Sequence, residues 1–189
     1  MIFAPLPTGK KYGVILADPP WAFRTWGGKD VTPHRTEVDH YSTETVRQLA
    51  QIPVADVAAK DCALFMWVVS SHIDQAIELG EAWGFKLKTN AFTWVKLTKD
   101  GKPKMGMGYW TRKGSEQCLM FTRGKPKRLS CGVREVICAQ PREHSRKPDQ
   151  QYRSIEQLVG GPYLEMFARQ AYPGWDAWGN QTDKFKAAA

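Results

Sequence analysis

The sequence of 189 residues lacks the patterns that identify several common protein classes. No apolar run approaches the roughly 20 residues that a membrane-spanning helix needs. Residues 1–5 contain no basic segment followed by a long apolar one, so we expect no signal peptide. The pattern Gly-x-Gly-x-x-Gly is absent, which argues against a dinucleotide-binding fold of the usual kind. We therefore expect a cytoplasmic protein that does not bind membranes.

Cysteine and histidine are scarce, with four of each in the chain. The cysteines, at positions 62, 118, 131 and 138, form no Cys-x-x-Cys pair, and the histidines show no ligand spacing. Cys62, Cys118 and Cys138 lie in apolar surroundings. We expect reduced, structural cysteines and no metal site.

The length, with 42% hydrophobic and 24% charged residues, suits one soluble domain that spans residues 1–189. Apolar, β-branched segments predict strands at 12–17, 63–69, 85–95, 117–122, 134–139, 163–168 and 175–178. Helical spacing and capping residues predict helices over 42–50, 70–83 and 147–159, the first two capped by Ser42 and by Ser70 or Ser71. Alternating strands and helices indicate an α/β sheet that is largely parallel.

The chain is organised around Asp18-Pro19-Pro20-Trp21, which follows the predicted strand 12–17. Two prolines end the strand, because neither can donate to a sheet ladder. The first proline also keeps Asp18 extended. The turn therefore holds a carboxylate beside a large aromatic ring at the carboxyl end of a strand, where ligands bind in open α/β sheets.

Such a turn suits methylation of the exocyclic amine of a base. This nitrogen is a poor nucleophile, because its lone pair is delocalised into the ring. Asp18 and the Pro19 carbonyl can accept its two N–H groups and draw the nitrogen toward tetrahedral geometry. Trp21 offers a face on which the base can stack, worth about 1–3 kcal/mol. The alternative is a structural turn in which Asp18 only caps a backbone N–H and Trp21 is part of the core.

Positive charge is concentrated in residues 96–134, which hold eleven Lys and Arg but only Asp100 and Glu116 as acids. This stretch carries +9 in a chain whose total is +8, as expected of a polyanion-binding surface. A lysine-rich surface without a ligand is the alternative. We expect the loops 22–41, which ends at Tyr41, and 97–115 to overhang the Asp18 edge. The predicted nucleic-acid contacts are Tyr41, Lys99, Lys102, Lys104, Trp110, Arg112, Lys113, Lys125, Lys127 and Arg128.

The C-terminal third carries a second group of polar residues at strand and helix ends. Glu165 lies inside an apolar strand, where an unpaired carboxylate is costly, and Arg169 follows that strand. Lys147 precedes a helix N-terminus, which suits an anionic group. Asn180 and Gln181 follow the last strand. Taken singly, each could also be a satisfied structural residue.

From residues 12 to 182 the sequence resembles the adenine-N6 methyltransferases typified by the catalytic subunit of the eukaryotic messenger-RNA N6-adenosine methyltransferase, and their small bacterial and phage relatives. The resemblance rests on six blocks in the same order, at residues 18–21, 64–68, 94–96, 147–149, 165–169 and 179–181. It implies a Rossmann-like S-adenosylmethionine-dependent fold in permuted order, with the catalytic turn ahead of the main cofactor strand.

The resemblance also implies the roles of the site residues. Asp18, Pro19, Pro20 and Trp21 match the turn that binds the target adenine. The positions that match S-adenosylmethionine contacts are Lys147, Glu165, Arg169, Asn180 and Gln181, and Asp18 is shared between the two sites.

We therefore expect an S-adenosylmethionine-dependent enzyme that methylates the N6 amine of adenine in DNA. The adenine would leave its stack to enter the pocket. The small chain, without an accessory RNA-binding module, favours DNA over RNA adenosine, which remains the alternative. A catalytically inactive nucleic-acid-binding partner is less favoured, because the Asp18–Trp21 turn is intact. The oligomeric state is left open.

Overall fold

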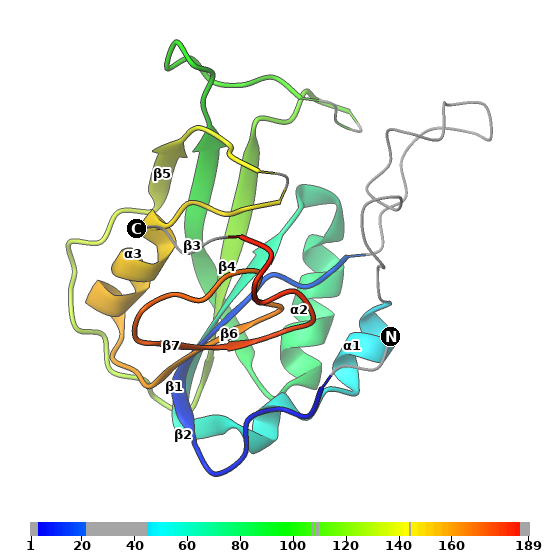
Figure 1. The fold of residues 1–189 in the computed structure, drawn as a ribbon, viewed down its shortest axis with the longest axis vertical. Coiled ribbons are helices and arrows are strands. Elements are labelled where there is room, and N and C mark those ends of the chain that lie inside the picture. Colours follow the sequence, from blue (N-terminus) through cyan, green and yellow to red (C-terminus); the bar gives the residue numbers. More distant parts are fainter. Residues whose placement is uncertain (1–3, 22–44, 107, 109, 144, 186–189) are drawn as a thin grey trace.

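The computed structural model describes residues 4–21, 45–106, 108, 110–143 and 145–185. Seven strands form one sheet in the order β5-β3-β4-β2-β1-β6-β7 (Figure 1). The strands are β1 (Tyr12–Ala17), β2 (Ala58–Val68), β3 (Lys86–Lys96), β4 (Ser115–Arg123), β5 (Val136–Ala139), β6 (Tyr163–Met166) and β7 (Trp175–Trp178). The helices are α1 (Val46–Ala50), α2 (Ile73–Ala82) and α3 (Gln150–Leu158), with 3-10 turns η3 (Val54–Asp56) and η4 (Ser70–His72). The predicted α/β class is confirmed.

Helices cover both faces of the central strands, which explains why those strands read as unbroken apolar runs. Val14 and Leu16 of β1 belong to the same buried cluster as Ile155 of α3. Ile15 and Ala17 point the other way, into the cluster packed under α1 and α2. The end of β1 is therefore fixed from both sides, and so is the start of the turn that follows it.

The prediction of a largely parallel sheet is confirmed, with one exception that matters for the site. The pairs β1–β2, β1–β6, β6–β7 and β3–β5 are parallel. β4 runs antiparallel between β2 and β3. As a result, β4 begins at the edge where β1 and β2 end, with Gln117 opposite Val68.

The helix starts differ from the predicted ones. Ser42 lies outside the described residues, and the cap of α1 is Thr45, whose Oγ1 accepts from the Gln48 N–H at 3.3 Å. The predicted Ser70 or Ser71 cap of α2 is wrong, because these residues form η4 and no side chain caps α2. None of the helices in the described ranges is long and apolar enough to cross a membrane.

Several strand limits also shift. β2 starts at Ala58, ahead of the predicted Ala63. β6 ends at Met166 because Phe167 adopts a left-handed backbone, with φ of 60°. Cys62 is buried as expected, but Cys138 is exposed because it lies on β5, at the edge of the sheet.

Candidate active site

The Asp18–Trp21 turn leaves the sheet from its centre. Asp18 directly follows β1, which pairs in parallel with β2 on one side and β6 on the other. The carboxyl ends of these three strands therefore meet at one edge of the sheet, as the sequence predicts. The Trp21 N–H donates to the Pro19 carbonyl at 2.9 Å, which uses one of the two lone pairs on that oxygen. No second donor among the described residues is recorded on this oxygen, so its other lone pair can accept from a ligand.

Asp18 is held by a lysine from far along the chain. Lys147 Nζ lies 2.7 Å from Asp18 Oδ2 and 3.3 Å from Glu116 Oε2. Glu116 pairs in turn with Lys96 through its other oxygen. These four residues form an alternating charge row, Lys96–Glu116–Lys147–Asp18. The Lys147 side chain is only 9% exposed, so removing either carboxylate would leave a poorly compensated buried charge.

The charge row shifts the ionisation of its own members. Burial alone would raise the pKa of Glu116, but the charges of Lys147 and Lys96 outweigh burial and lower this pKa to about 2. Burial opposes the charge on Lys147, yet Asp18 and Glu116 together hold the pKa of Lys147 above its usual range. Both residues are therefore charged at neutral pH.

Sequence reasoning placed Lys147 near an anion but missed Lys96 and Glu116. Lys96 ends β3 and Glu116 stands at the start of β4, so only the antiparallel direction of β4 brings them together beside Asp18. One signal was present in the sequence. Glu116 is one of only two acids in the strongly basic stretch 96–134.

Trp21 is more deeply buried than a stacking platform would need to be. Its residue exposure is 4%, and its indole N–H donates to the Trp67 carbonyl at 3.1 Å. Most of the ring therefore belongs to the core. Trp21 also lines a cavity that opens over the turn. Stacking of a base on Trp21 therefore stays a prediction, and it is restricted to the part of the ring that this cavity reaches.

A cavity of about 520 Å³ opens over the turn. Asp18, Pro19 and Trp21 line it, as do the other three members of the charge row. Its volume lies within the range of about 300–1,000 Å³ that is typical of small-molecule sites. We call it the Asp18 cavity.

A second, narrow cavity of about 20 Å³ shares Asp18, Lys147 and Arg169 with the first and adds Glu165 and Gln170. The prediction that Glu165 needs a partner is confirmed, because the Tyr152 hydroxyl donates to Glu165 Oε2 at 2.9 Å. Burial is the main reason that the pKa of Glu165 rises to about 8, and the hydrogen bond from Tyr152 only partly offsets it. Gln170 Oε1 is a buried acceptor without a hydrogen-bond partner in the described part of the chain.

The structure therefore gathers Asp18, Lys147, Glu165 and Arg169 around two cavities that share lining residues. Asn180 and Gln181 follow β7 at the same edge of the sheet, since β7 runs parallel to β6. Both are exposed, and neither lines the two cavities.

The predicted nucleic-acid residues fall into two separate groups, and Tyr41 lies outside the described residues. The loop between β3 and β4 does overhang the Asp18 edge, because Lys104, Gly106 and Lys113 line the Asp18 cavity. The other predicted residues of this loop, Lys99, Lys102, Trp110 and Arg112, are exposed.

Lys125, Lys127 and Arg128 are also exposed, but they follow the far end of β4. Arg123, the last residue of β4, pairs with Cys62 of β2, whereas the start of β4 pairs with Val68 at the end of β2. The three basic residues that follow Arg123 therefore lie toward the edge of the sheet opposite Asp18. Antiparallel β4 therefore carries the chain across the sheet between the two groups, so the predicted nucleic-acid surface over 96–134 is divided between two edges of the sheet.

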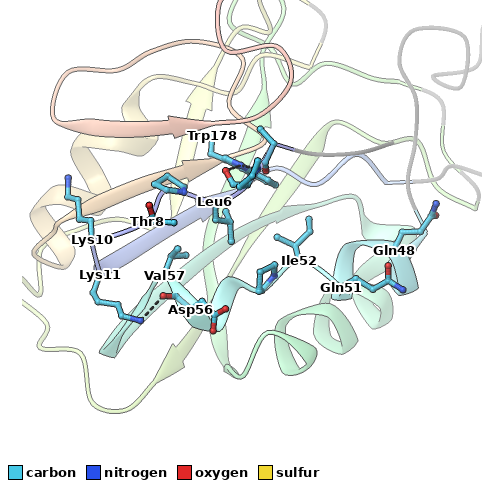
Figure 2. A pocket seen from close by; sticks show the side chains of 15 residues that line it. Leu6, Thr8, Lys10, Lys11, Gln48, Gln51, Ile52, Asp56, Val57 and Trp178 are labelled. Carbon is cyan, nitrogen blue, oxygen red and sulfur yellow. Dashed lines mark hydrogen bonds between the residues drawn. The ribbon is translucent and has the colours of Figure 1, made fainter.

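Another cavity, of about 700 Å³, lies between the N-terminal segment and the region of α1 and η3 (Figure 2). Apolar side chains such as Leu6, Ile52 and Val57 line it, and at its rim Lys11 donates to the Asp56 carbonyl at 2.6 Å. None of the residues predicted for the site lines it, so the Asp18 cavity is the better candidate. Within the described ranges, no cluster of three or more His, Cys, Asp or Glu side chains could hold a metal ion.

Comparison with known proteins identifies the family to which the chain belongs. The family model MT-A70 matches residues 12–181. The chain is 34% identical over 197 residues to Type II methyltransferase M.MunI from Mycoplasma sp, covering 94% of this chain and 80% of that protein. It is 32% identical to the human N(6)-adenosine-methyltransferase catalytic subunit METTL3, covering 92% of this chain but 28% of that protein. An Arabidopsis thaliana N(6)-adenosine-methyltransferase MT-A70-like protein is 31% identical and is covered over 24% of its length.

The order of elements also agrees with the permuted Rossmann-like methyltransferase fold, since the Asp18 turn precedes β6, the strand that carries Glu165. A family model that matches almost the whole chain, including the turn and the charge row, establishes that this protein belongs to the MT-A70 methyltransferase family.

Proposed function

We propose that the protein transfers a methyl group from S-adenosylmethionine to the N6 amine of adenine in DNA. The observation that carries this proposal is Asp18, paired with Lys147 at the mouth of a cavity large enough for a base. The whole described and matched region would act as one methyltransferase domain within residues 1–189. We propose that the protein acts in the cytoplasm, where it would meet its nucleic-acid substrate.

Two acceptors at the turn would orient the amine. Lys147 binds Asp18 through Oδ2, which leaves Oδ1 without a recorded donor among the described residues, and this oxygen would accept one N–H of the adenine amine. The Pro19 carbonyl, with its second lone pair, would accept the other. Most of the rate would come from holding the nitrogen in line with the methyl group and away from water. The proton then leaves to water, directly or through Asp18.

The residues around the narrow cavity fit the functional groups of S-adenosylmethionine. Lys147 and Arg169 are cations for its carboxylate, and Lys147 keeps a third donor beyond its two ion pairs. Glu165 and the unpartnered Gln170 Oε1 are acceptors for hydroxyl or ammonium groups. The cofactor supplies a methyl group made electrophilic by the sulfonium. At about 20 Å³ the narrow cavity must widen to admit it, whereas the Asp18 cavity is already of ligand size.

DNA is the preferred substrate because the match to the type II methyltransferase covers most of that protein, whereas the match to METTL3 covers about a quarter. RNA adenosine is the alternative, supported by the relatives named for that activity. A catalytically inactive partner is disfavoured by the intact turn and by the lysine that holds its carboxylate.

The test is methyl transfer from labelled S-adenosylmethionine to matched adenine-containing DNA and RNA oligonucleotides. We expect label in N6-methyladenine of DNA. Label only in RNA would assign the alternative, and label in neither, at concentrations where the cofactor binds, would contradict the proposed enzyme.

A further inference from the structure

A large cavity of about 910 Å³ lies beside the Asp18 cavity, and none of the steps proposed for methyl transfer uses it. It forms where the start of α1, the turn η4 with the start of α2, and the loop after β3 come together. Figure 1 shows this loop extending from the top of the sheet toward the side on which α1 and α2 lie. The lining residues are Thr45, Val46, Arg47, Ser70, Ser71, His72, Gln75, Glu78, Trp110, Thr111 and Lys113. We call it the flanking cavity.

The flanking cavity adjoins the Asp18 cavity at two points. Lys113 lines both of them. Trp21 lines the Asp18 cavity, and its ring centroid lies 6.3 Å from that of His72, which lines the flanking cavity. The two cavities therefore share Lys113 and lie on either side of the Trp21–His72 pair.

The lining of the flanking cavity suits a nucleotide. Trp110 is 90% exposed, the highest value among the large apolar side chains that the structure describes, and an exposed indole is a stacking platform for any base. Arg47 and Lys113 are cations suited to phosphate. Gln75 can donate to and accept from the edge of a base, and Ser71, whose Oγ lies 2.9 Å from His72 Nδ1, keeps a lone pair that can accept from it. Glu78 is the one acid in the lining and can accept from an exocyclic amine.

We propose that the flanking cavity binds the nucleotide next to the target adenine and that Ser71 and Gln75 read its base. This inference rests on the proposed function, because a nucleotide flipped into the Asp18 cavity brings its covalent neighbour to the wall between the two cavities. Lys113, which lines both, faces the phosphate that joins the two nucleotides. Trp110 holds the neighbouring base by stacking and is indifferent to its identity, so Ser71 and Gln75 are the specificity-determining residues.

The first experiment uses a pool of DNA oligonucleotides with a single adenine between random positions drawn from C, G and T. Methylated molecules are enriched and sequenced for the wild type, Gln75→Ala, Ser71→Ala and Leu129→Ala. Leu129 is an exposed apolar residue that lines neither cavity and serves as the matched control. We expect a roughly tenfold base preference at one position next to the adenine in the wild type and in the control. Gln75→Ala should lose most of this preference and keep the profile at the other positions.

The second experiment replaces the base at that position by an abasic residue. The wild type and Trp110→Phe should lose about tenfold in kcat/KM, whereas Trp110→Ala, which has no stack to lose, should be nearly insensitive to the change. Melting temperatures and cofactor affinities of all variants confirm that each is folded.

Three outcomes would overturn the inference. The first is a wild-type enzyme that methylates the pool without preference at either neighbour. The second is a base preference next to the adenine that is the same in Gln75→Ala and Ser71→Ala as in the wild type. The third is an equal loss of kcat/KM on the abasic substrate in the wild type and in Trp110→Ala. If the wild type methylates no adenine in DNA, the proposed function itself fails and the inference falls with it, which distinguishes the two cases.

Discussion

Lys147 Nζ lies 2.7 Å from Asp18 Oδ2, although 129 positions separate the two residues in the chain. This ion pair joins the turn after β1 to the start of α3 and fixes the carboxylate that would orient the adenine amine. Lys147 also bonds to Glu116, so the position of Asp18 depends on β4 as well.

Glu116→Gln should lower methylation by roughly tenfold. The control variant Glu81→Gln, which changes an exposed carboxylate, should lower it much less. The variant removes one of the two carboxylates that hold Lys147 and costs about 1–3 kcal/mol of stability, because charged hydrogen bonds are lost. Turnover and urea unfolding measure the two effects. Wild-type turnover in Glu116→Gln would show that Lys147 holds Asp18 without its help.

Acid should destabilise the protein partly through Glu116. Its pKa is about 2 in the folded state against 4.5 ordinarily, so the stabilisation by its ionised form is present above pH 4.5 and is lost as the pH falls toward 2. Glu116→Gln should therefore lose less stability than the wild type across this window. Urea unfolding at pH 5 and pH 3 provides the comparison, and parallel losses would contradict the assignment.

Glu165 should have the opposite dependence in the cofactor-free protein. Its pKa rises from 4.5 to about 8, so the folded state keeps a proton that the unfolded state releases, and stability falls as the pH rises through this window. Glu165→Gln resembles the protonated form and should flatten that decline between pH 5 and pH 8. A wild-type slope in the variant would show that Glu165 is ionised in the folded protein.

Asn180→Ala should weaken S-adenosylmethionine binding by roughly tenfold, as expected for the loss of a hydrogen bond to a charged ligand. Calorimetry measures the affinity, and Gln157→Ala, an exposed amide on α3, is the matched control. Lys147→Ala should weaken binding too and should abolish turnover besides, because it also releases Asp18. Unchanged affinity in both variants would remove these two residues from the cofactor site.

The two basic groups should differ in their response to salt. Replacing Lys99, Lys102 and Lys104 together by alanine should reduce the salt dependence of DNA affinity by up to about three phosphates. The weakening should be similar on all sequences, because phosphate contacts carry no base information. The matched triple variant of Lys125, Lys127 and Arg128, toward the opposite edge of the sheet, should keep the wild-type slope. Equal slopes for all three proteins would mean that the loop lysines do not contact DNA.

The sequence predicts the features of this site that depend on local chemistry. The apolar run before Asp18 predicts β1, and two prolines predict that the strand ends there, because neither residue can donate to the ladder. The sequence also predicts that Glu165 has a hydrogen-bond donor as its partner, since a buried carboxylate needs one. It does not identify Tyr152 as that donor.

The sequence could not predict features that depend on strand direction. Glu116 reaches Lys147 only because β4 is inserted antiparallel between β2 and β3. The same reversal carries Lys125 away from Asp18 and divides a basic stretch that is continuous in the sequence. The burial of Trp21 depends on the Trp67 carbonyl, which comes from the neighbouring strand β2.

The most direct test of the proposed chemistry is single-turnover methyl transfer to an adenine-containing DNA oligonucleotide by the wild type, Asp18→Asn and Asp74→Asn. Asp18→Asn keeps the shape of the side chain but removes the carboxylate, and Asp74, exposed at the start of α2, is the control. We expect Asp18→Asn to be at least about 100-fold slower than the wild type, with cofactor affinity largely kept and Asp74→Asn unaffected. A rate for Asp18→Asn within about tenfold of the wild type would contradict the role of Asp18 in orienting the amine.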